Sequence, residues 1–266
     1  MKSISLRYRA LRRNLKELSG YLRFERNGND IVRRTDFTDC KKPVLLIYGF
    51  MATRRSFEIL EHRLRRDGYG VFSINLGGLF DAFNTRGIDE SAEKVRDKVE
   101  RLYARYNLGP LSIIGHSKGG LIGRYYVKRL GGDSRVKTLV TLGAPHHGTP
   151  RAYLGCFTLG WIAKSVWQMT PMSPFIRRLK MGAFPRGVRF TSVYSKADGA
   201  TPFPTAILEE DGHNHLFNVE VAGVRHREFL SKRAVYEVVA RELALGYGEA
   251  APVTQLRAVI GLTGKP

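Results

Sequence analysis

Pro110-Leu-Ser-Ile-Ile-Gly-His-Ser-Lys-Gly-Gly-Leu121 is the most informative segment of this chain. Its apolar first half is typical of a short buried strand, and a helical pattern follows it through Arg129. Between them, Gly115-His-Ser-Lys-Gly119 fits the G-x-S-x-G pattern, in which a sharp turn exposes a serine hydroxyl. Such a turn strains the serine backbone and crowds the residues two before and two after it, so that only small residues fit there. The segment therefore predicts a strand–turn–helix unit with Ser117 as a nucleophile.

From Pro43 onward, the chain alternates between strand-like and helix-like segments. The strands are expected at residues 44–48, 70–75, 111–115, 136–142, 188–194 and 215–221. The helices are expected at residues 54–66, 89–106, 118–130 and 227–245. Repeated βα units imply a mainly parallel sheet with helices on both faces. A chain of 266 residues, 43% of them hydrophobic, can form one such α/β domain with a sizeable core.

Residues 150–186 interrupt this alternation. They contain both tryptophans of the chain and many other large apolar residues, yet they connect two predicted strands. We expect a helical cap or lid insertion over the carboxyl ends of the strands, which could form an acyl-binding wall. The alternative is a set of ordinary core helices.

The N-terminal segment has a pattern of its own. Apolar residues recur along residues 2–23 at alternating spacings of three and four, surrounded by Lys and Arg with Glu17 as the one acidic residue. A basic amphipathic helix of this kind can lie on an anionic membrane surface. The alternative is a helix that packs on the domain or on a second copy of itself. The expected organisation is thus a helix within residues 1–30, a catalytic domain over 31–250 and a tail at 251–266.

The net charge of +20 suggests anionic partners, either nucleic acid or an acidic membrane surface. No zinc-ligand spacing and no RNA-binding signature is present, so we expect no nucleic-acid partner.

Cys40 and Cys156 do not make a disulfide framework and are expected to be thiols. With no secretory signal and no apolar run long enough to span a membrane, the sequence favours a cytoplasmic protein. Residues 1–23 would let it bind peripherally to the inner face of the membrane.

A serine hydroxyl needs a base, and the base needs an orienting group. In proteins with this turn, the chain order is Ser, then acid, then His. His226 is the predicted base because it follows the last strand, at the sheet edge where Ser117 is expected. Asp198 is the predicted acid because it follows the preceding strand, with Asp211 as the alternative. His213 and His215 precede the last strand and are interpreted as surface or turn residues.

The oxyanion formed during acyl transfer needs backbone N–H donors. One is expected from Lys118, directly after the nucleophile, and the other from Phe50 or, alternatively, Met51, in the loop after the first strand. The Lys118 side chain either contributes its charge or is a solvated lysine at a helix start. The adjacent His146 and His147 lack nearby acidic ligands, so we expect no metal and no cofactor.

Two segments resemble a known family. Gly115-His-Ser-Lys-Gly-Gly-Leu-Ile-Gly-Arg-Tyr-Tyr126 and Thr141-Leu-Gly-Ala-Pro-His-His-Gly-Thr149 are similar to the bacterial lipase and esterase group of the α/β-hydrolase superfamily. Triacylglycerol lipases and the related lipid-anchor deacylases carry such segments. The resemblance implies an α/β-hydrolase fold over residues 43–245 and hydrolysis of carboxylic esters by Ser117, Asp198 and His226. The group usually has His-Gly after the first strand, where this chain has Tyr48-Gly49.

The sequence therefore predicts a serine hydrolase (lipase or esterase) acting on esters of lipids or other apolar acyl groups through an acyl-enzyme. An acyltransferase would use the same acyl-enzyme and pass it to an alcohol. A non-catalytic membrane-associated binding protein on a hydrolase scaffold is the third hypothesis. The oligomeric state is left open.

Overall fold

The structure is a computed structural model, and it describes residues 36–78, 83–159, 163–209 and 215–250. The predicted amphipathic helix within 1–30 and the tail at 251–266 lie outside these ranges. So do Asp211 and His213.

Six parallel strands form one sheet in the order β2-β1-β3-β4-β5-β6. The strands are β1 (Pro43–Ile47), β2 (Gly70–Ser73), β3 (Leu111–His116), β4 (Val136–Leu142), β5 (Arg189–Tyr194) and β6 (Leu216–Glu220). Every residue of β1 and β3 is buried, as expected for the middle of a parallel sheet covered on both sides. The predicted strands and their parallel pairing are confirmed.

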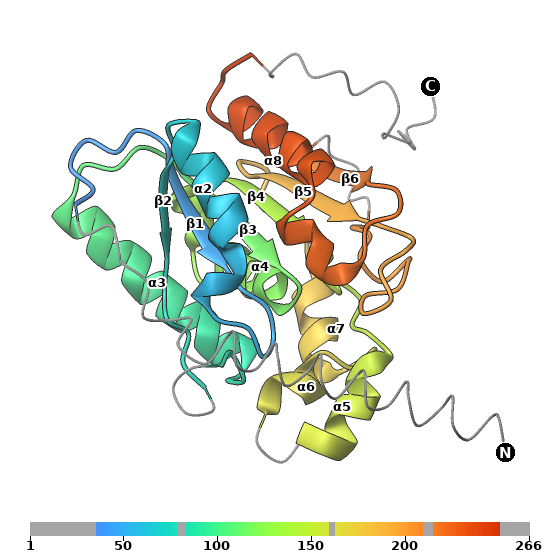
Figure 1. Cartoon of the computed structure of the whole chain (residues 1–266). Helices are drawn as coiled ribbons and strands as arrows, with labels where there is room; N and C mark the ends of the chain where they lie inside the picture. Colours follow the sequence, from blue (N-terminus) through green and yellow to red (C-terminus); the bar gives the residue numbers. More distant parts are fainter. Residues whose placement is uncertain (1–35, 79–82, 160–162, 210–214, 251–266) are drawn as a thin grey trace, which may run out of the picture.

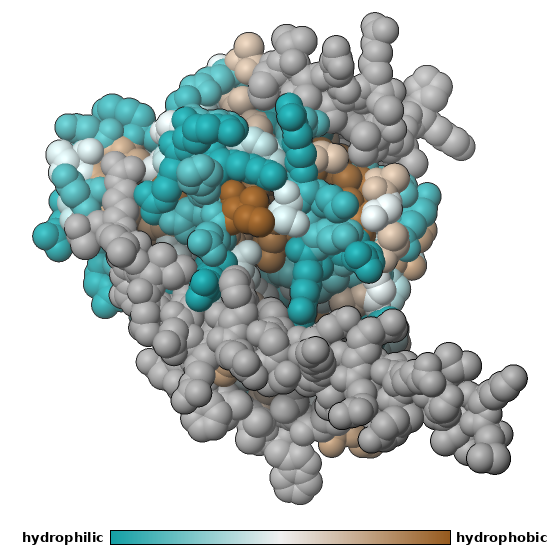
Figure 2. All heavy atoms as spheres, viewed as in Figure 1, coloured by the Kyte–Doolittle hydropathy of each residue, from teal (hydrophilic) through white to brown (hydrophobic). Residues whose placement is uncertain are grey.

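Helices cover both faces of this sheet (Figure 1). The longer ones are α2 (Glu58–Arg66), α3 (Ile88–Arg105), α4 (Lys118–Arg129) and α8 (Arg233–Gly246), and short 3-10 turns are η1 (Arg54–Phe57), η3 (Gly132–Ser134) and η4 (His226–Leu230). α3 packs beside α4, whereas α8 lies next to α2, where the Arg63 guanidinium is 5.6 Å from the centre of the Tyr236 ring. On the face shown in Figure 2, hydrophilic side chains surround a small apolar patch.

The strand order determines where a site can form. β1 lies next to both β2 and β3, so the chain leaves β1 toward one edge of the sheet and leaves β3 toward the other. In open α/β sheets a crevice forms at such a switch point, at the carboxyl ends of the strands. The loop after β1 and the turn at Ser117 after β3 both start there.

The insertion at residues 150–186 is helical and lies at one end of the molecule (Figure 1). It contains α5 (Arg151–Leu159), α6 (Lys164–Gln168) and α7 (Pro174–Lys180). α7 is an ordinary core helix, because Ile176 and Leu179 are buried and Phe175 stacks on Tyr125 of α4 at 5.4 Å between ring centres. Other large apolar side chains of the insertion are exposed: Tyr153, Leu154, Phe157, Trp167 and Met172. The role of this exposed part as a cap stays a prediction.

Candidate active site

Ser117 lies on a strained turn between β3 and α4. Its φ of 55° and ψ of −125° are unusual for a residue with a side chain. A Cβ added to Gly115 would lie 2.6 Å from the Gly119 carbonyl oxygen, and one added to Gly119 would lie 2.0 Å from the Ile47 oxygen. The turn therefore needs both glycines, as the sequence pattern predicts.

His226 and Asp198 meet at the carboxyl edge of the sheet. The Nδ1–H of His226, in the first residue of η4, donates to Oδ2 of Asp198 at 2.8 Å. Asp198, in the loop after β5, is 3% exposed, and its Oδ1 accepts the amides of Ala200 at 2.8 Å and Thr201 at 3.0 Å. Burial acts to raise the pKa of Asp198, but these hydrogen bonds and the contact with His226 outweigh it and hold the pKa below its usual value. The carboxylate is therefore ionised and fixed as an acceptor.

The end of β4 connects this pair to Ser117. The Ser117 amide donates to the carbonyl oxygen of Leu142, the last residue of β4, at 2.9 Å. Gly143 follows with a φ of +53°, and a Cβ built on it would lie 2.8 Å from Oδ2 of Asp198 and 3.3 Å from Nδ1 of His226. A side chain at this position would therefore push the pair apart. The structure thus pairs two of the three predicted residues, Asp198 and His226, beside the end of β4, and the amide of the third, Ser117, is bonded to the last residue of that strand.

His116 belongs to this site, although the sequence analysis assigned it no role. Its Nε2 lies 2.9 Å from the main-chain oxygen of His226, and the two imidazole rings are 4.7 Å apart between centres. Burial, with the charge of His226 as a smaller cause, lowers the pKa of His116 to about 3. The ring is thus neutral, and because a carbonyl can only accept, Nε2 carries the proton. The only sequence signal was its place directly before Ser117.

The residues predicted to supply the oxyanion donors belong to two segments that adjoin Ser117. A Cβ built on Gly49 would lie 3.0 Å from the Cβ of Ser117, so the loop carrying Phe50 and Met51 runs against the nucleophile. Met51 adopts a φ of 54°. Lys118 is the first residue of α4, and the first N–H groups of a helix have no partner within the helix. The positive end of the helix dipole adds to this anion-binding character.

The side chain of Lys118 is fully buried, so the interpretation as a solvated lysine is wrong. Its Nζ donates to Asn84 at both the main-chain oxygen (3.1 Å) and Oδ1 (2.8 Å), and to the main-chain oxygen of Arg86 at 2.6 Å. Asn84 in turn donates from Nδ2 to the Tyr48 carbonyl oxygen at 2.8 Å. We call this contact the Asn84–Lys118 latch. The latch joins the loops after β1 and β2 to the turn after β3. Burial lowers the pKa of the Lys118 ammonium well below its usual value.

The other histidines have separate partners. Nε2 of His146 lies 2.9 Å from the Thr141 hydroxyl, and Nε2 of His147 lies 2.9 Å from the Ile207 carbonyl oxygen. Among the residues that the structure describes, no three His, Cys, Asp or Glu side chains gather as metal ligands. His215 lies in the turn directly before β6, at the opposite edge from Ser117, which agrees with its interpretation as a turn residue, and its side chain is buried. Both cysteines are buried thiols, as predicted.

Within the described ranges, no helix is long and apolar enough to cross a membrane.

Comparisons with known proteins agree with this fold. Residues 42–155 match the family described as the alpha/beta hydrolase fold. A GPI inositol-deacylase of Candida albicans is 26% identical over 140 residues, which are 52% of this chain and 29% of that protein. A triacylglycerol lipase of Pseudarthrobacter phenanthrenivorans is 29% identical over 115 residues, which are 40% of this chain and 34% of that protein. Each match thus spans less than half of the relative's own length.

Among solved structures, lipase B of Aspergillus fumigatus superimposes with a TM-score of 0.62 at 18% identity, over 77% of this chain and 53% of that one. At this identity the likeness establishes the fold alone. The chain has the α/β-hydrolase fold, and the resemblance to lipases, esterases and lipid-anchor deacylases is confirmed.

Proposed function

We propose that this chain is a serine hydrolase that cleaves carboxylic esters of lipids or other apolar acyl groups. The observation that carries the proposal is the hydrogen bond of 2.8 Å between His226 Nδ1 and Asp198 Oδ2, made beside the strand end that binds the Ser117 amide. A base that is oriented by a buried carboxylate, next to a serine on a strained turn, is the arrangement that acyl transfer requires.

In the proposed first half-reaction, Ser117 Oγ attacks the ester carbonyl carbon while Nε2 of His226 takes the hydroxyl proton. Asp198 keeps Nδ1 protonated, so that Nε2 can act as the base, and it stabilises the imidazolium that forms. The amides of Lys118 and Phe50 would donate to the oxyanion of the tetrahedral intermediate. When this intermediate collapses, His226 returns the proton to the leaving alcohol and an acyl-serine remains.

Water attacks the acyl-serine in the second half-reaction, again with His226 as the base. Oγ of Ser117 leaves with the proton, and the carboxylic acid is released. An alcohol in place of water would give the acyltransferase outcome.

The apolar substrate class is supported by the surface next to the site. Leu154 and Phe157 on α5 are 71% and 85% exposed. The start of α5 adjoins the loop of the proposed acid, since the Thr149 hydroxyl donates to the Ala200 carbonyl oxygen at 2.9 Å. Large apolar groups that stay exposed beside a reaction site favour an apolar ligand or surface. The names of the relatives, a triacylglycerol lipase and a GPI inositol-deacylase, favour the same class.

Labelling with a fluorophosphonate probe tests the nucleophile. Wild type is expected to be labelled, Ser117→Ala is not, and Ser134→Ala, which changes an exposed serine, serves as the matched control. Absence of labelling in folded wild type would leave the binding-protein hypothesis. Rates on p-nitrophenyl esters of graded acyl length then define the acyl pocket, and product analysis with an added alcohol separates hydrolase from acyltransferase.

Peripheral membrane contact through residues 1–23 is part of the same proposal. The basic residues of this segment support it. Deletion of residues 1–23 and added salt are both expected to weaken binding to anionic vesicles. Unchanged binding after the deletion would argue against the contact.

A further inference from the structure

Ser195 is a buried serine that the proposed reaction does not use. It directly follows the last residue of β5 and is 1% exposed. Its Oγ accepts the amide of Ala197 at 3.2 Å and the amide of Val224 at 3.1 Å. Ala197 comes directly before Asp198, and Val224 lies two residues before His226. One hydroxyl oxygen therefore holds the loop of the proposed acid to the loop of the proposed base.

This contact lies just beyond the paired part of β5 and β6. The two strands pair as far as Tyr194 and Glu220, and the Val221 amide then donates to the Tyr194 carbonyl oxygen at 2.8 Å. Past this point the chain has left both strands. The bond from the Val224 amide to the Ser195 hydroxyl links the two loops there, in place of a main-chain ladder.

Other contacts hold each loop separately. The Thr201 hydroxyl donates to the Gly143 carbonyl oxygen at 3.0 Å, which fixes the acid loop to the end of β4. The Arg225 amide donates to Oε2 of Glu228 at 2.9 Å, which fixes the start of η4. Neither contact joins the acid loop to the base loop, as the Ser195 hydroxyl does.

The distance between the two loops matters for catalysis because a hydrogen bond weakens steeply when its donor and acceptor are misaligned. Alanine at position 195 would leave the amides of Ala197 and Val224 without this acceptor, and the bond to Val224 is buried. An unpaired buried N–H is costly, so the loops would move until another group or water reached it. A misplacement of about 1 Å in an active site can cost about 10² in rate.

We propose that Ser195 is a positioning residue that sets the alignment of Asp198 and His226 through its bonds to the two loops. It acts through this pair and contacts neither substrate nor reacting atoms, since its oxygen is occupied by main-chain amides. Its effect on kcat rests on the proposed function, whereas the alignment of the pair can be measured separately.

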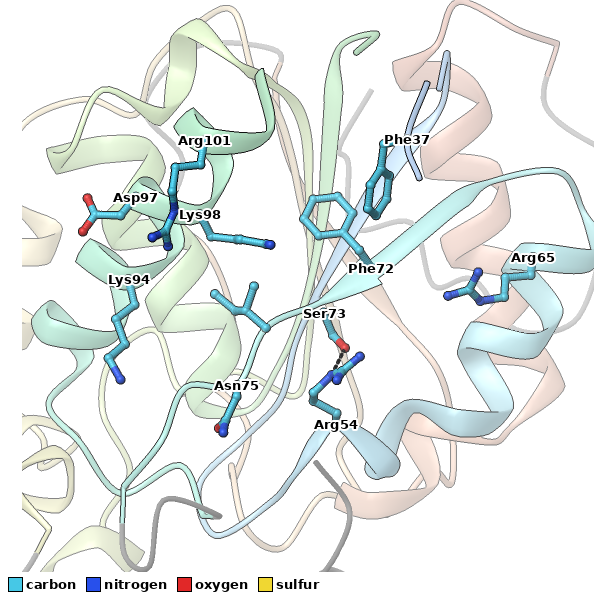
Figure 3. A pocket seen from close by; sticks show the side chains of 11 residues that line it. Phe37, Arg54, Arg65, Phe72, Ser73, Asn75, Lys94, Asp97, Lys98 and Arg101 are labelled. Carbon is cyan, nitrogen blue, oxygen red and sulfur yellow. Dashed lines mark hydrogen bonds between the residues drawn. The ribbon is translucent and has the colours of Figure 1, made fainter. Parts of the chain in front are cut away.

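Two other serines provide matched controls. Ser192 is buried on the same strand, and its hydroxyl donates to the Ala206 carbonyl oxygen at 2.6 Å. Ser73 is the last residue of β2, and its hydroxyl accepts Nε of Arg54 at 2.7 Å (Figure 3). It lines a pocket of about 390 Å³ whose lining contains no residue of the proposed triad. Alanine at either position removes a hydroxyl contact without touching the link between the acid loop and the base loop.

The first measurement is hydrolysis of a p-nitrophenyl ester by the full-length protein and its variants. Ser195→Ala is expected to lower kcat about tenfold to a hundredfold and to keep KM within about twofold, since the change acts on the base and not on substrate binding. Ser192→Ala and Ser73→Ala are expected to keep kcat within about twofold. Ser195→Cys has a similar size but a weaker acceptor, so its kcat should lie between those of wild type and Ser195→Ala. This variant carries the test if Ser195→Ala does not fold.

Combination with Asp198→Asn separates positioning from a general loss of stability. If Ser195 acts through the Asp198–His226 pair, Ser195→Ala should lower kcat far less in the Asp198→Asn background than in wild type, because the pair is already disabled there. An equal fold-loss in both backgrounds would overturn the proposal. So would an unchanged kcat in the folded Ser195 variants, or the same loss in Ser192→Ala.

A proton NMR signal tests the alignment without activity. The Nδ1–H of His226, bonded to Asp198, is expected to resonate far downfield and to be assigned by its loss in His226→Gln. Ser195→Ala should shift this signal upfield or broaden it through exchange with water, whereas both control variants should leave it unchanged. An unchanged signal in Ser195→Ala would overturn the positioning role. Wild type that lacks esterase activity, together with a shifted signal in Ser195→Ala, would contradict the proposed function and support the positioning role.

Discussion

The Nε2–H of His116 donates to the main-chain oxygen of His226 at 2.9 Å. The residue before the proposed nucleophile therefore supports the backbone of the proposed base. The contact needs a neutral imidazole with the proton on Nε2, and burial provides this by lowering the pKa of His116 to about 3. The turn at Ser117 thus fixes two members of the site, the serine directly and the base through its neighbour.

This relationship predicts an acid-sensitive contribution to stability. Below the ordinary pKa of 6.5 the unfolded chain takes up a proton on His116, whereas the folded protein resists it until about pH 3. The free energy of unfolding should therefore fall as the pH is lowered through this window, by up to about 1.4 kcal/mol per pH unit for one group. His116→Gln keeps an N–H donor near the Nε2 position and does not titrate. Urea unfolding at about pH 4 and about pH 7 is expected to show a smaller difference in His116→Gln than in wild type.

Measurements of kcat and KM separate the effect of the hydrogen bond made by His116 from the effect of its titration. His116→Gln is expected to keep kcat within a few-fold of wild type, whereas His116→Leu loses the donor and lowers kcat without a matching change in KM. If both variants have the same kcat, the contact with the His226 carbonyl does not position the base.

Asp198→Asn tests the orienting carboxylate. An amide of the same shape can hold His226 in the wrong tautomer, so kcat on a p-nitrophenyl ester is expected to fall roughly 10³–10⁴-fold while the chain stays folded. Asp211→Asn changes the alternative acid and is expected to leave kcat near wild type. If Asp211→Asn caused a large loss of kcat and Asp198→Asn a small one, Asp211 and not Asp198 would be the orienting acid.

The sequence predicts the strands, their parallel pairing and the turn at Ser117 well, because these features follow from local patterns. Strand-like segments of four to seven residues, mostly apolar in β1 to β4, become the parallel strands, and the two glycines around Ser117 indicate a crowded turn. Asp198 and His226 are predicted from chain order and from their places after the last two strands, since loops after neighbouring parallel strands open at one edge of the sheet. Their hydrogen bond is a consequence of the strand order β4-β5-β6.

Local sequence patterns do not reveal contacts between segments that are far apart in the chain. The sequence alone favours a surface position for Lys118, because a lysine at the start of a helix is usually solvated. Its hydrogen-bond acceptors on Asn84 and Arg86 lie 34 and 32 residues away in the chain. His116 meets His226 across 110 residues. In both cases burial, which depends on how the loops pack together, decides the role of the side chain.

The Asn84–Lys118 latch is expected to affect catalysis through the loop after β1, which carries the predicted oxyanion donor Phe50. Lys118→Met keeps the length of the side chain but leaves the carbonyl groups of Asn84 and Arg86 without their donor, so the loop containing Phe50 should shift. Loss of one oxyanion donor typically costs about 10²–10³ in kcat, and a displaced donor should cost part of that, roughly tenfold to a hundredfold. KM should change little, because the donor acts on the transition state.

Lys137→Met, which replaces an exposed lysine on β4, is the control for this variant. Stability is a poor readout of the latch, since removal of a buried charge relieves its desolvation and offsets the lost hydrogen bonds. An unchanged kcat in folded Lys118→Met would show that the latch does not position the oxyanion donors.

Gly119→Ala provides a test of the turn that separates packing from helix propensity. Alanine inside a helix is favoured over glycine by about 0.8–1.0 kcal/mol, so propensity alone predicts a more stable protein. The added Cβ, however, would lie 2.0 Å from the Ile47 carbonyl oxygen, and main-chain atoms of a central strand cannot move aside as a flexible side chain can. Overpacking of this kind costs about 1–3 kcal/mol or more, so the free energy of unfolding should fall and labelling of Ser117 should weaken. Gly187→Ala, where an added Cβ meets nothing within 4 Å, should be close to neutral in the same urea titration. A Gly119→Ala protein as stable as wild type would mean that β1 and α4 approach each other less closely than the crowded turn requires.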